Sequence, residues 1–424
     1  MQIIDGTSSD DKGSPIIDLR RLCQACYKER TSHGWCKDCE TSYMILNFAR
    51  WTTGNKNLDN LIRNTQKNAA QTCDYLEYID FNEFDSIEFI AKGGFSAVYK
   101  AEWLEGPRWN WDEVGQMWCR SGPITVALKR LDNSQNISND FLNQVERHHR
   151  CLQSGSLADC FGITRDPTGA FMFVMRYYEN GNLYQYLDKS KGIISWRDMV
   201  DMLWGVAGGL ERIHAENRFH SNLHGGNLLI EDEAVSTDAR IADVGLHGPA
   251  DKFKPSQIYG VLPFIAPEIL LGEKPSQSSD IYSFGIIMCT LATGKRPFAD
   301  RSHDFNLAKE ICFNNLRPDI SDIFDDMPKA YYEWMVKCWD ADPQKRPTAS
   351  QLNELLGEWI TSICDDPNPS VIADQFSHAD EKRWELIGKH MNKIHSPSIH
   401  PGAYFISRPI DFFIINNFCN FHKL

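Results

Sequence analysis

The chain has 424 residues, of which 42% are hydrophobic and 12% aromatic, a composition that supports a sizeable core and excludes a chain that is disordered throughout. Its formal charge of -13 and pI near 5.5 argue against nucleic acid or an anionic membrane as the main partner. The polar, acidic start lacks the features of a signal peptide, and the most apolar run, residues 284–294, is too short to cross a bilayer. We therefore expect a cytoplasmic protein whose thirteen cysteines are reduced and which has no membrane span.

Several segments differ from the rest of the chain in composition. Residues 1–20 are polar and are predicted to be a flexible tail. Residues 46–82 are predicted to be a helical connector, because an apolar stripe recurs at helical spacing. This stripe consists of Leu58, Leu61, Ile62 and Thr65. Residues 105–124 are rich in Trp and Gly and are predicted to be an enlarged surface loop that carries partner specificity. Residues 363–424 form a C-terminal extension without an interpretable motif.

Two pairs of cysteines precede the connector, within residues 21–45. Each pair encloses two residues, and nine residues separate the pairs, which are Cys23, Cys26, Cys36 and Cys39. This spacing lets four thiolates surround one Zn²⁺ tetrahedrally. The alternatives are two disulfides, disfavoured by a reducing compartment, and unrelated core cysteines, disfavoured by the doubled spacing. We predict a structural zinc module with a core of its own and with partners binding around Trp35.

The central part of the chain changes its periodicity once. Residues 84–106 alternate apolar and polar side chains on both sides of a glycine pair, which predicts two strands joined by a glycine-rich turn. After Val174 the pattern becomes helical, and one predicted helix carries apolar residues at spacings of four and three. They are Met199, Leu203, Val206, Leu210 and Ile213. The sequence thus predicts a small lobe of strands followed by a larger helical lobe.

Eight motifs in order give the central region a family resemblance. They are AKGGFSAV, VALK, VMRYYENGNL, HSNLHGGN, ADVG, IAPE, SDIYSFG and CWDADPQKRPT. Together they resemble the protein kinase superfamily, and the last motif with HSNLHGGN resembles its tyrosine-kinase-like branch. The cysteine head joined to such a region is similar to that of fungal kinase-like proteins. The resemblance implies an α+β fold over residues 83–362, with a small antiparallel β lobe carrying one helix and a large helical lobe.

The resemblance also implies a site for ATP and Mg²⁺. Glycine-rich turns let backbone N–H groups approach phosphates, and hard cations need oxygen ligands beside them. The positions that match the family's nucleotide-contacting residues are Ala91, Gly93, Ser96, Val98, Lys129, Met175 and Tyr177. Of these, Val98 would cover the adenine and Lys129 would contact the phosphates. Met175 matches the family's gatekeeper position, and Tyr177 lies in the segment 176–178 that matches the hinge. Asn227 and Asp243 match the two magnesium ligands.

Two matched positions lack the family's acidic residue. Asn222 stands where an aspartate would accept the proton of the substrate hydroxyl, and an amide cannot take that proton. Gln144 stands where a helix glutamate would pair with Lys129. Glu146 follows two residues later, roughly 200° around the helix, and is expected to point away from the cleft. Three other matches are expected to be structural: Glu268 with Arg346 as a buried ion pair, and Asp280 as a brace for the catalytic loop.

Three functions are compatible with these residues. The first is an ATP-binding pseudokinase or very weakly active kinase, because the phosphate and metal positions are kept while Asn222 and Gln144 replace acidic residues. The second is an active serine, threonine or tyrosine protein kinase that transfers the γ-phosphate of ATP to proteins. The third is a scaffold that binds no nucleotide. In each case the expected partners are proteins, as substrates or as binding partners.

Overall fold

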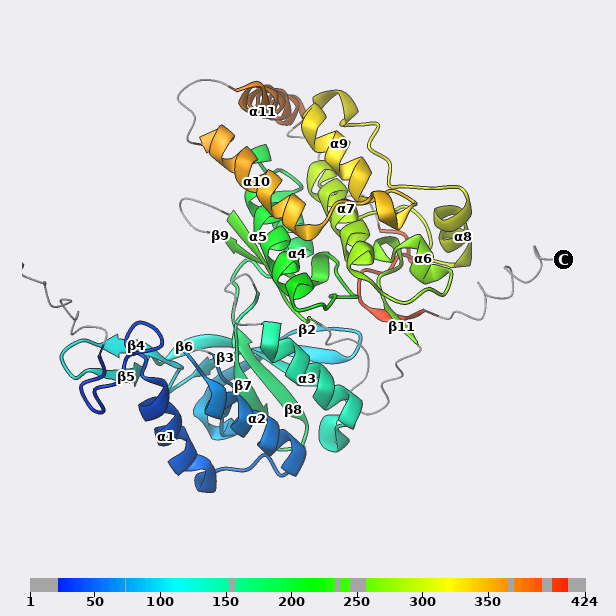
Figure 1. Cartoon of the computed structure of the whole chain (residues 1–424). Helices are drawn as coiled ribbons and strands as arrows, with labels where there is room; N and C mark the ends of the chain where they lie inside the picture. Colours follow the sequence, from blue (N-terminus) through cyan, green and yellow to red (C-terminus); the bar gives the residue numbers. More distant parts are fainter. Residues whose placement is uncertain are drawn as a thin grey trace, which may run out of the picture.

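The computed structural model of the chain describes residues 22–72, 74–151, 157–232, 237–244, 257–364, 370–390 and 399–410. The described part has two lobes, one built on a sheet and one of packed helices (Figure 1). The α+β, two-lobed fold predicted from the sequence is confirmed. The predicted tail, residues 1–20, lies outside the described residues, as do residues 411–424 of the C-terminal extension.

The small lobe is built on a six-stranded sheet with the strand order β1-β7-β8-β6-β3-β2. The strands are β1 (Glu77–Tyr78), β2 (Phe84–Lys92), β3 (Ser96–Trp103), β6 (Ile124–Leu131), β7 (Cys160–Arg165) and β8 (Phe171–Arg176). All pairs are antiparallel except β1 with β7, which run parallel. The connector therefore contributes a strand to the sheet in addition to its predicted helix.

Three helices accompany this sheet (Figure 1). They are α1 (Lys37–Asn47), α2 (Lys56–Asn68) and α3 (Asn139–Cys151). The predicted apolar stripe of the connector is confirmed on α2, where Leu58 and Ile62 are fully buried and share a core with Phe141 and Val145 of α3. The side chain of Asn55 begins α2 by accepting two backbone N–H bonds. The connector thus fastens the N-terminal region to α3.

The structure corrects the predictions of an enlarged loop and of a separate cysteine-rich core. Residues 105–124 contain the hairpin β4 (Arg108–Asp112) and β5 (Met117–Arg120). Trp118 of this hairpin packs against Trp35 with ring centroids 6.1 Å apart, and Tyr75 stacks on Trp35 at 5.9 Å. Trp35 is fully buried and does not itself face a partner, whereas the binding of partners on the surface around it stays a prediction. Apolar burial has joined the cysteine-rich head to the hairpin.

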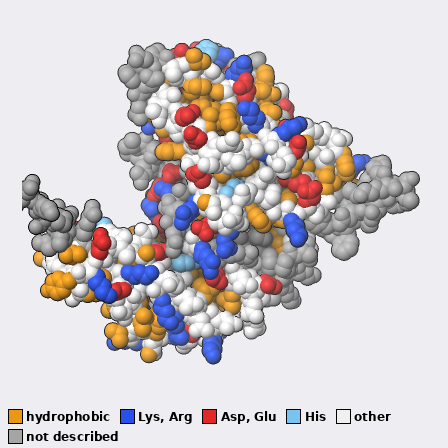
Figure 2. All heavy atoms as spheres, in the orientation of Figure 1, with side chains coloured by type: hydrophobic (Ala, Val, Ile, Leu, Met, Phe, Trp, Pro, Cys, Tyr) orange, Lys and Arg blue, Asp and Glu red, His pale blue; other side chains and the backbone are white. Residues whose placement is uncertain are grey.

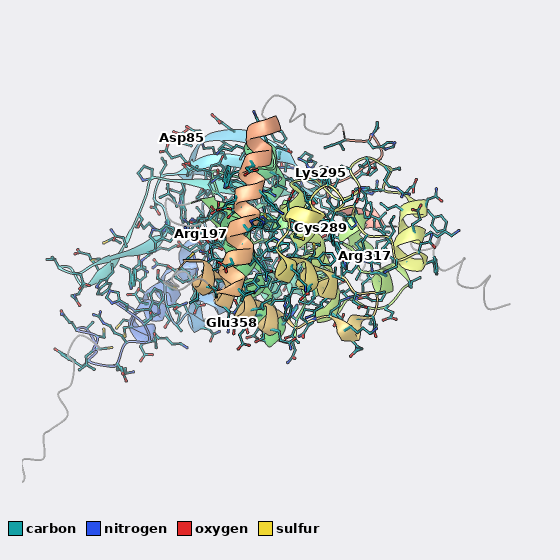
Figure 3. The ribbon with its side chains drawn as sticks, turned by 90° about the horizontal axis from the view of Figure 1, so that it is seen from above. Asp85, Arg197, Cys289, Lys295, Arg317 and Glu358 are labelled. Carbon is teal, nitrogen blue, oxygen red and sulfur yellow. The ribbon has the colours of Figure 1, made fainter. Side chains whose placement is uncertain are left out.

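The large lobe is formed by eight helices among the described residues. They are α4 (Leu183–Ser190), α5 (Trp196–Ala215), α6 (Pro267–Leu270), α7 (Gln277–Thr293), α8 (Phe305–Phe313), α9 (Lys329–Cys338), α10 (Ala349–Cys364) and α11 (Val371–His390). The predicted stripe from Met199 to Ile213 is confirmed, because all five of its residues are buried on α5. Cys289 of α7 is buried inside this lobe, whereas Glu358 of α10 is exposed at its edge (Figure 3).

Two small sheets lie at the junction of the lobes. The hairpin of β9 (Leu228–Asp232) and β10 (Thr237–Ile241) belongs to the large lobe. Strand β11 (Ile258–Gly260) pairs with β12 (Arg408–Ile410), which comes from the C-terminal extension. The short 3-10 turns are η2 (Phe48–Arg50), η3 (Phe81–Glu83), η4 (Ser134–Asn136), η6 (Gly225–Asn227), η7 (Leu262–Phe264), η8 (Phe324–Asp326) and η9 (Pro343–Lys345).

The surface carries both signs of charge. Figure 2 shows Lys and Arg side chains interspersed with Asp and Glu over both lobes on the face drawn. None of the helices in the described part of the chain is long and apolar enough to span a bilayer.

Candidate functional site

The glycine-rich turn lies between β2 and β3, where the sequence predicts it. Ala91 of β2 pairs with Val98 of β3, and the Gly93 N–H donates to the Ser96 carbonyl oxygen at 2.7 Å. The ring of Phe95, at the tip, meets the edge of Tyr259 in the large lobe at 5.4 Å. The turn is therefore closed down onto the large lobe.

Lys129 projects from the middle strand of the sheet, β6, which pairs with β3 and β8. Its ammonium group forms an ion pair with the carboxylate of Asp243, and both side chains are largely buried. Burial alone would raise the pKa of Asp243, but the charge and hydrogen bond of Lys129 outweigh it and hold this pKa below its usual range. The structure thus brings together the predicted phosphate contact and a predicted metal ligand.

Helix α3 places Gln144 in the interior, with 1% of its surface exposed. Glu146 lies on the exposed side of the helix and pairs with Arg150 one turn later. The prediction that Glu146 points away from the cleft is confirmed. His148, one turn after Gln144, is buried as well, and both of its ring nitrogens lack a hydrogen-bond partner in the described structure. Burial lowers the pKa of His148 to about 4, so the ring is neutral near pH 7.

The loop that contains His220, Ser221 and Asn222 is held by Asp280 of α7. Its carboxylate accepts the backbone N–H of His220 at 2.7 Å and that of Ser221 at 2.9 Å, and it lies 2.9 Å from the His214 ring. Ser221 has a φ of 67°, a left-handed conformation that a serine adopts only when its surroundings hold it there. The prediction that Asp280 braces this loop is confirmed.

Asn227 and Asp243 lie side by side because the β9–β10 hairpin joins the segments that carry them. Leu228 pairs with Ile241, and the Ala242 N–H donates to the Asn227 carbonyl oxygen at 2.9 Å. The Asn227 side-chain NH₂ group donates to the Asn222 carbonyl oxygen at 2.9 Å. This bond orients the amide and leaves its oxygen as the atom that could hold a cation. An amide oxygen beside a carboxylate fits Mg²⁺, a hard cation that needs oxygen donors.

The side chain of Asn222 is hydrogen-bonded to the hydroxyl group of Ser407, from the C-terminal extension. Asn222 Nδ2 donates to Ser407 Oγ at 2.9 Å, and Ser407 Oγ donates to Asn222 Oδ1 at 3.1 Å. His224 Nε2 lies 2.9 Å from the same hydroxyl. The Nδ1 atom of His224 accepts the Gly226 N–H, so the proton of the neutral ring is on Nε2 and is donated to Ser407. Burial lowers the pKa of His224 to about 3, which keeps this ring neutral.

The hinge is the segment that follows β8. Met175 is buried at the end of β8, in the core that contains α2 and α3. Tyr177 is half-buried, and the ammonium group of Lys100 lies 5.2 Å from the centre of its ring. The backbone from Arg176 onward connects the two lobes. The family resemblance implies that this connecting segment offers backbone hydrogen bonds to adenine.

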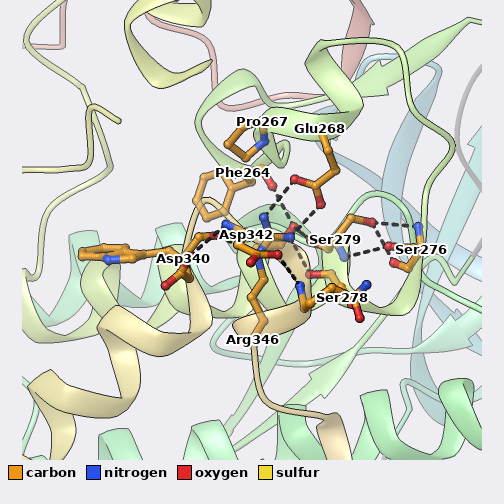
Figure 4. A network of polar contacts seen from close by, with 12 residues as sticks. Phe264, Pro267, Glu268, Ser276, Ser278, Ser279, Asp340, Asp342 and Arg346 are labelled. Carbon is orange, nitrogen blue, oxygen red and sulfur yellow. Dashed lines mark hydrogen bonds and ion pairs between the residues drawn. The ribbon is translucent and has the colours of Figure 1, made fainter. Parts of the chain in front are cut away.

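A buried ion pair anchors the large lobe (Figure 4). Both Arg346 terminal nitrogens donate to the carboxylate of Glu268, at 2.6 and 2.8 Å. Arg346 also donates to the carbonyl oxygens of Asp340 and Ser278. Because charge and hydrogen bonds are both satisfied, the pair is stable in spite of its burial. The predicted pairing of Glu268 with Arg346 is confirmed.

The four cysteines of the N-terminal head form one cluster. The sulfur atoms of Cys23, Cys26, Cys36 and Cys39 all lie within 4.8 Å of one another, with the pairs Cys23–Cys39 at 3.8 Å and Cys26–Cys36 at 3.4 Å. Zinc–sulfur bonds of about 2.3 Å in a tetrahedron place sulfur atoms about 3.8 Å apart. The cluster therefore fits a four-thiolate zinc site.

A sheet lobe joined to a helical lobe, with a lysine on the sheet paired to an aspartate that lies beside an asparagine of the large lobe, is the arrangement of a protein kinase fold. Residues 84–356 match the family of protein tyrosine and serine/threonine kinases. The chain belongs to this family.

Relatives in Dictyostelium discoideum carry the same region within longer proteins. One probable serine/threonine-protein kinase is 26% identical over 66% of this chain and 16% of its own length. The probable serine/threonine-protein kinase pats1 is 28% identical over 70% of this chain and 9% of its own length. Cyclic GMP-binding protein C is 27% identical over 63% of this chain and 11% of its own length. The chain thus spans less than a fifth of the length of each of these three relatives.

Sequence reasoning missed three residues of the site. Ser407 lies in an extension without a motif, and only the fold brings it to Asn222. His224 stands within the quoted motif HSNLHGGN but was given no role, although its ring contacts the hydroxyl. His148 follows Gln144 by one helical turn, and that spacing is the signal that could have placed it near the cleft.

Proposed function

We propose that the protein binds ATP with Mg²⁺ in the cleft between its lobes and transfers phosphate poorly or not at all. The observation that carries the proposal is the contact of Asn222 with a serine hydroxyl. An amide occupies the place of the proton acceptor, whereas Lys129, Asn227 and Asp243 keep the chemistry needed for phosphates and a cation. The chain would then act in signalling as a nucleotide-dependent interaction module.

The binding half of the proposal rests on side chains that lie together in the cleft. Lys129 would contact the α- and β-phosphates, and Asp243 and Asn227 would supply oxygen ligands to the cation. When bound, Mg²⁺ neutralises phosphate charge and helps to hold the phosphates in place. The Lys129–Asp243 ion pair holds both side chains in position before any ligand enters. The closed glycine-rich turn would cover the phosphates.

The catalytic half rests on the chemistry of an amide. Asn222 Oδ1 accepts the hydrogen bond of the acceptor hydroxyl, so it orients the acceptor as an aspartate would. It has no accessible pKa at which it could take the proton, and loss of a general base costs about 10²- to 10⁴-fold in rate. His224 Nε2 donates to the hydroxyl oxygen of Ser407 and thereby uses a lone pair with which that oxygen would have to attack. The contacts of Asn222 and His224 therefore favour the binding of a hydroxyl group over its attack on the γ-phosphate.

An active serine/threonine kinase is the second candidate. It is favoured by the relatives, two of which are named probable serine/threonine-protein kinases, and by the serine hydroxyl that is already oriented at Asn222. A scaffold without nucleotide is the third candidate. The assignment to the tyrosine-kinase-like branch and the cytoplasmic location remain predictions from the sequence.

Thermal unfolding with nucleotide separates the first two candidates from the third. Saturating ATP should raise the melting temperature when Mg²⁺ is present, because ligand that binds only the folded state stabilises it by mass action. Lys129→Ala and Asp243→Ala should remove most of the shift. Lys295→Ala is the matched control, since this exposed lysine pairs with Asp322 in the large lobe. A melting temperature of the wild-type chain that does not respond to ATP and Mg²⁺ would support the scaffold instead.

A further inference from the structure

A segment of the C-terminal extension, Ala403–Ile410, lies at the junction of the two lobes. In Figure 1 it is the red trace beside β11. Strand β12 pairs antiparallel with β11, in a register that places Arg408 opposite Gly260 and Ile410 opposite Ile258. The Gln257 side chain donates to the Ile410 carbonyl oxygen. The segment therefore binds as an added strand, a mode in which the backbone supplies affinity and the side chains supply specificity.

Phe405 is the apolar anchor of this segment. It is one of the buried residues of the large-lobe core. Its ring meets Tyr184 at 5.6 Å and His303 at 5.0 Å, both edge to face. The guanidinium group of Arg296 lies 5.5 Å from the centre of the same ring. A buried aromatic residue in such a pocket provides much of the binding energy of a docked peptide.

Arg408, directly after Ser407, is the second anchor of the segment. Its guanidinium group donates to the His303 carbonyl oxygen at 2.7 Å and stacks over the ring of Tyr404 at 3.7 Å. The His303 N–H in turn donates to the Gly402 carbonyl oxygen at 2.8 Å. These bonds fix the register, because a shift by one residue would turn Phe405 out of its pocket.

Ser407 lies between these two anchors, directly at the catalytic loop. Its hydroxyl group contacts Asn222 and His224 in the large lobe. Its carbonyl oxygen lies against Gly94 of the small lobe, where an added Cβ atom would come within 1.9 Å of it. The segment thus touches both lobes and places a serine hydroxyl where the proposed function requires the acceptor group.

We propose that Ala403–Ile410 is a built-in substrate mimic that occupies the peptide-binding groove of this domain. The groove accepts an extended peptide with an aromatic residue two positions before a serine and an arginine directly after it. Peptides of this pattern from other proteins can enter only when the chain's own segment has left. The inference rests on the proposed function only in taking the groove beside Asn222 as the acceptor site, and it requires no nucleotide.

Binding of a peptide in trans tests this inference. A fluorescent peptide with the sequence of residues 400–410 is titrated, without nucleotide, into the full wild-type chain and into a Phe405→Ala/Arg408→Glu variant. We expect the variant to bind the peptide at least tenfold more tightly, because its own segment no longer fills the groove. Phe313→Ala, which changes a half-exposed aromatic residue on α8, should behave like the wild type. A peptide in which the matching phenylalanine is alanine should bind weakly to all variants.

A further substitution shows where the peptide binds. Gly94 does not have a positive φ, so alanine is compatible with its backbone and acts only through its methyl group. Adding Gly94→Ala to the variant should abolish peptide binding, whereas Gly357→Ala on α10, whose Cβ atom would come no closer than 3.4 Å to Trp204, should change it little. Hydrogen exchange of residues 403–410 reports whether the segment is released. A released segment without peptide binding, or equal binding by wild type and variant, would overturn the inference, whatever the result with ATP.

Discussion

At the residue scale, Asn222 and Asn227 carry the same side chain but have different hydrogen-bond partners. Asn227 turns its amide nitrogen to the Asn222 backbone, so its oxygen is the group left to hold a cation. Asn222 uses both amide atoms on one hydroxyl group. Asparagine keeps the shape and the hydrogen bond of aspartate at position 222, but it cannot become a base. The loss of a base at position 222 could be predicted from the sequence alone, because it depends only on the residue type and on the matched motif.

The buried ring of His148 should make the folded chain sensitive to acid. Its pKa is about 4 in the folded state, below the ordinary value of 6.5, so the unfolded chain binds a proton first as the pH falls. Stability is therefore lost between about pH 6.5 and pH 4, by up to roughly 3 kcal/mol for this group. His148→Leu should reduce this loss and leave stability at pH 7.5 similar or higher, because two unpartnered nitrogens are removed.

Urea unfolding of both proteins from pH 7.5 to pH 4.5 measures this difference. Acid sensitivity that is identical with and without His148 would mean that the ring is not buried as a neutral group. A His378→Leu variant is the control, since this histidine lies on the exposed side of α11.

The Glu268–Arg346 pair leads to a prediction of stability. Glu268→Gln should destabilise the chain by about 3–5 kcal/mol, because Arg346 would keep a charge in a fully buried place without a counter-charge. Asp322→Asn, which breaks the exposed pair with Lys295, should have a much smaller effect. Chemical denaturation compares the two variants with the wild type. Equal effects of the two substitutions would contradict a buried, charged Arg346.

At the scale of elements, local patterns predicted the helices better than the irregular strands. Apolar stripes identified α2 and α5, because helical spacing is visible within one segment. The hairpin β4–β5 was predicted as a loop, since its Trp and Gly content hides the alternation and its Trp118 is buried only by contact with Trp35. The pairing of β12 with β11 joins residues about 150 positions apart, and no local pattern reports such a contact.

The cysteine-rich head gives a prediction at this scale. Elemental analysis of the reduced protein should find about one zinc ion per chain. Cys36→Ser should lower the melting temperature of the small lobe and shift tryptophan fluorescence to the red, because Trp35 and Trp118 share one core. If the head had a core of its own, Cys36→Ser would unfold only the head and leave the melting temperature of the small lobe unchanged.

The control for this experiment is Cys364→Ser, at an exposed cysteine at the end of α10. It should leave the zinc content and the melting curve unchanged. A protein without zinc, or a Cys36→Ser variant that melts like the wild type, would contradict a metal site that stabilises the head.

At the scale of the whole molecule, the motif order predicted the fold and most of the cleft. Lys129, Asn227 and Asp243 come together as the family resemblance implies. The resemblance could not show that Ser407 contacts Asn222, because the residues before and after Ser407 match no motif. That contact depends on how the two lobes and the C-terminal extension pack together, which is a property of the complete fold.

Measurement of the phosphate-transfer rate shows whether the chain transfers phosphate poorly or not at all, as we propose. Labelled γ-phosphate is followed from ATP and Mg²⁺ into the chain itself and into an added generic protein substrate. The wild-type chain should transfer at or below the detection limit, and Asn222→Asp should raise the rate about 10²-fold, at the low end of the range for a restored general base, since Gln144 still replaces the helix glutamate. Asn217→Asp, at an exposed position, is the control. Wild-type turnover at ordinary kinase rates of about 1–100 s⁻¹, unchanged by Asn222→Asp, would contradict the account.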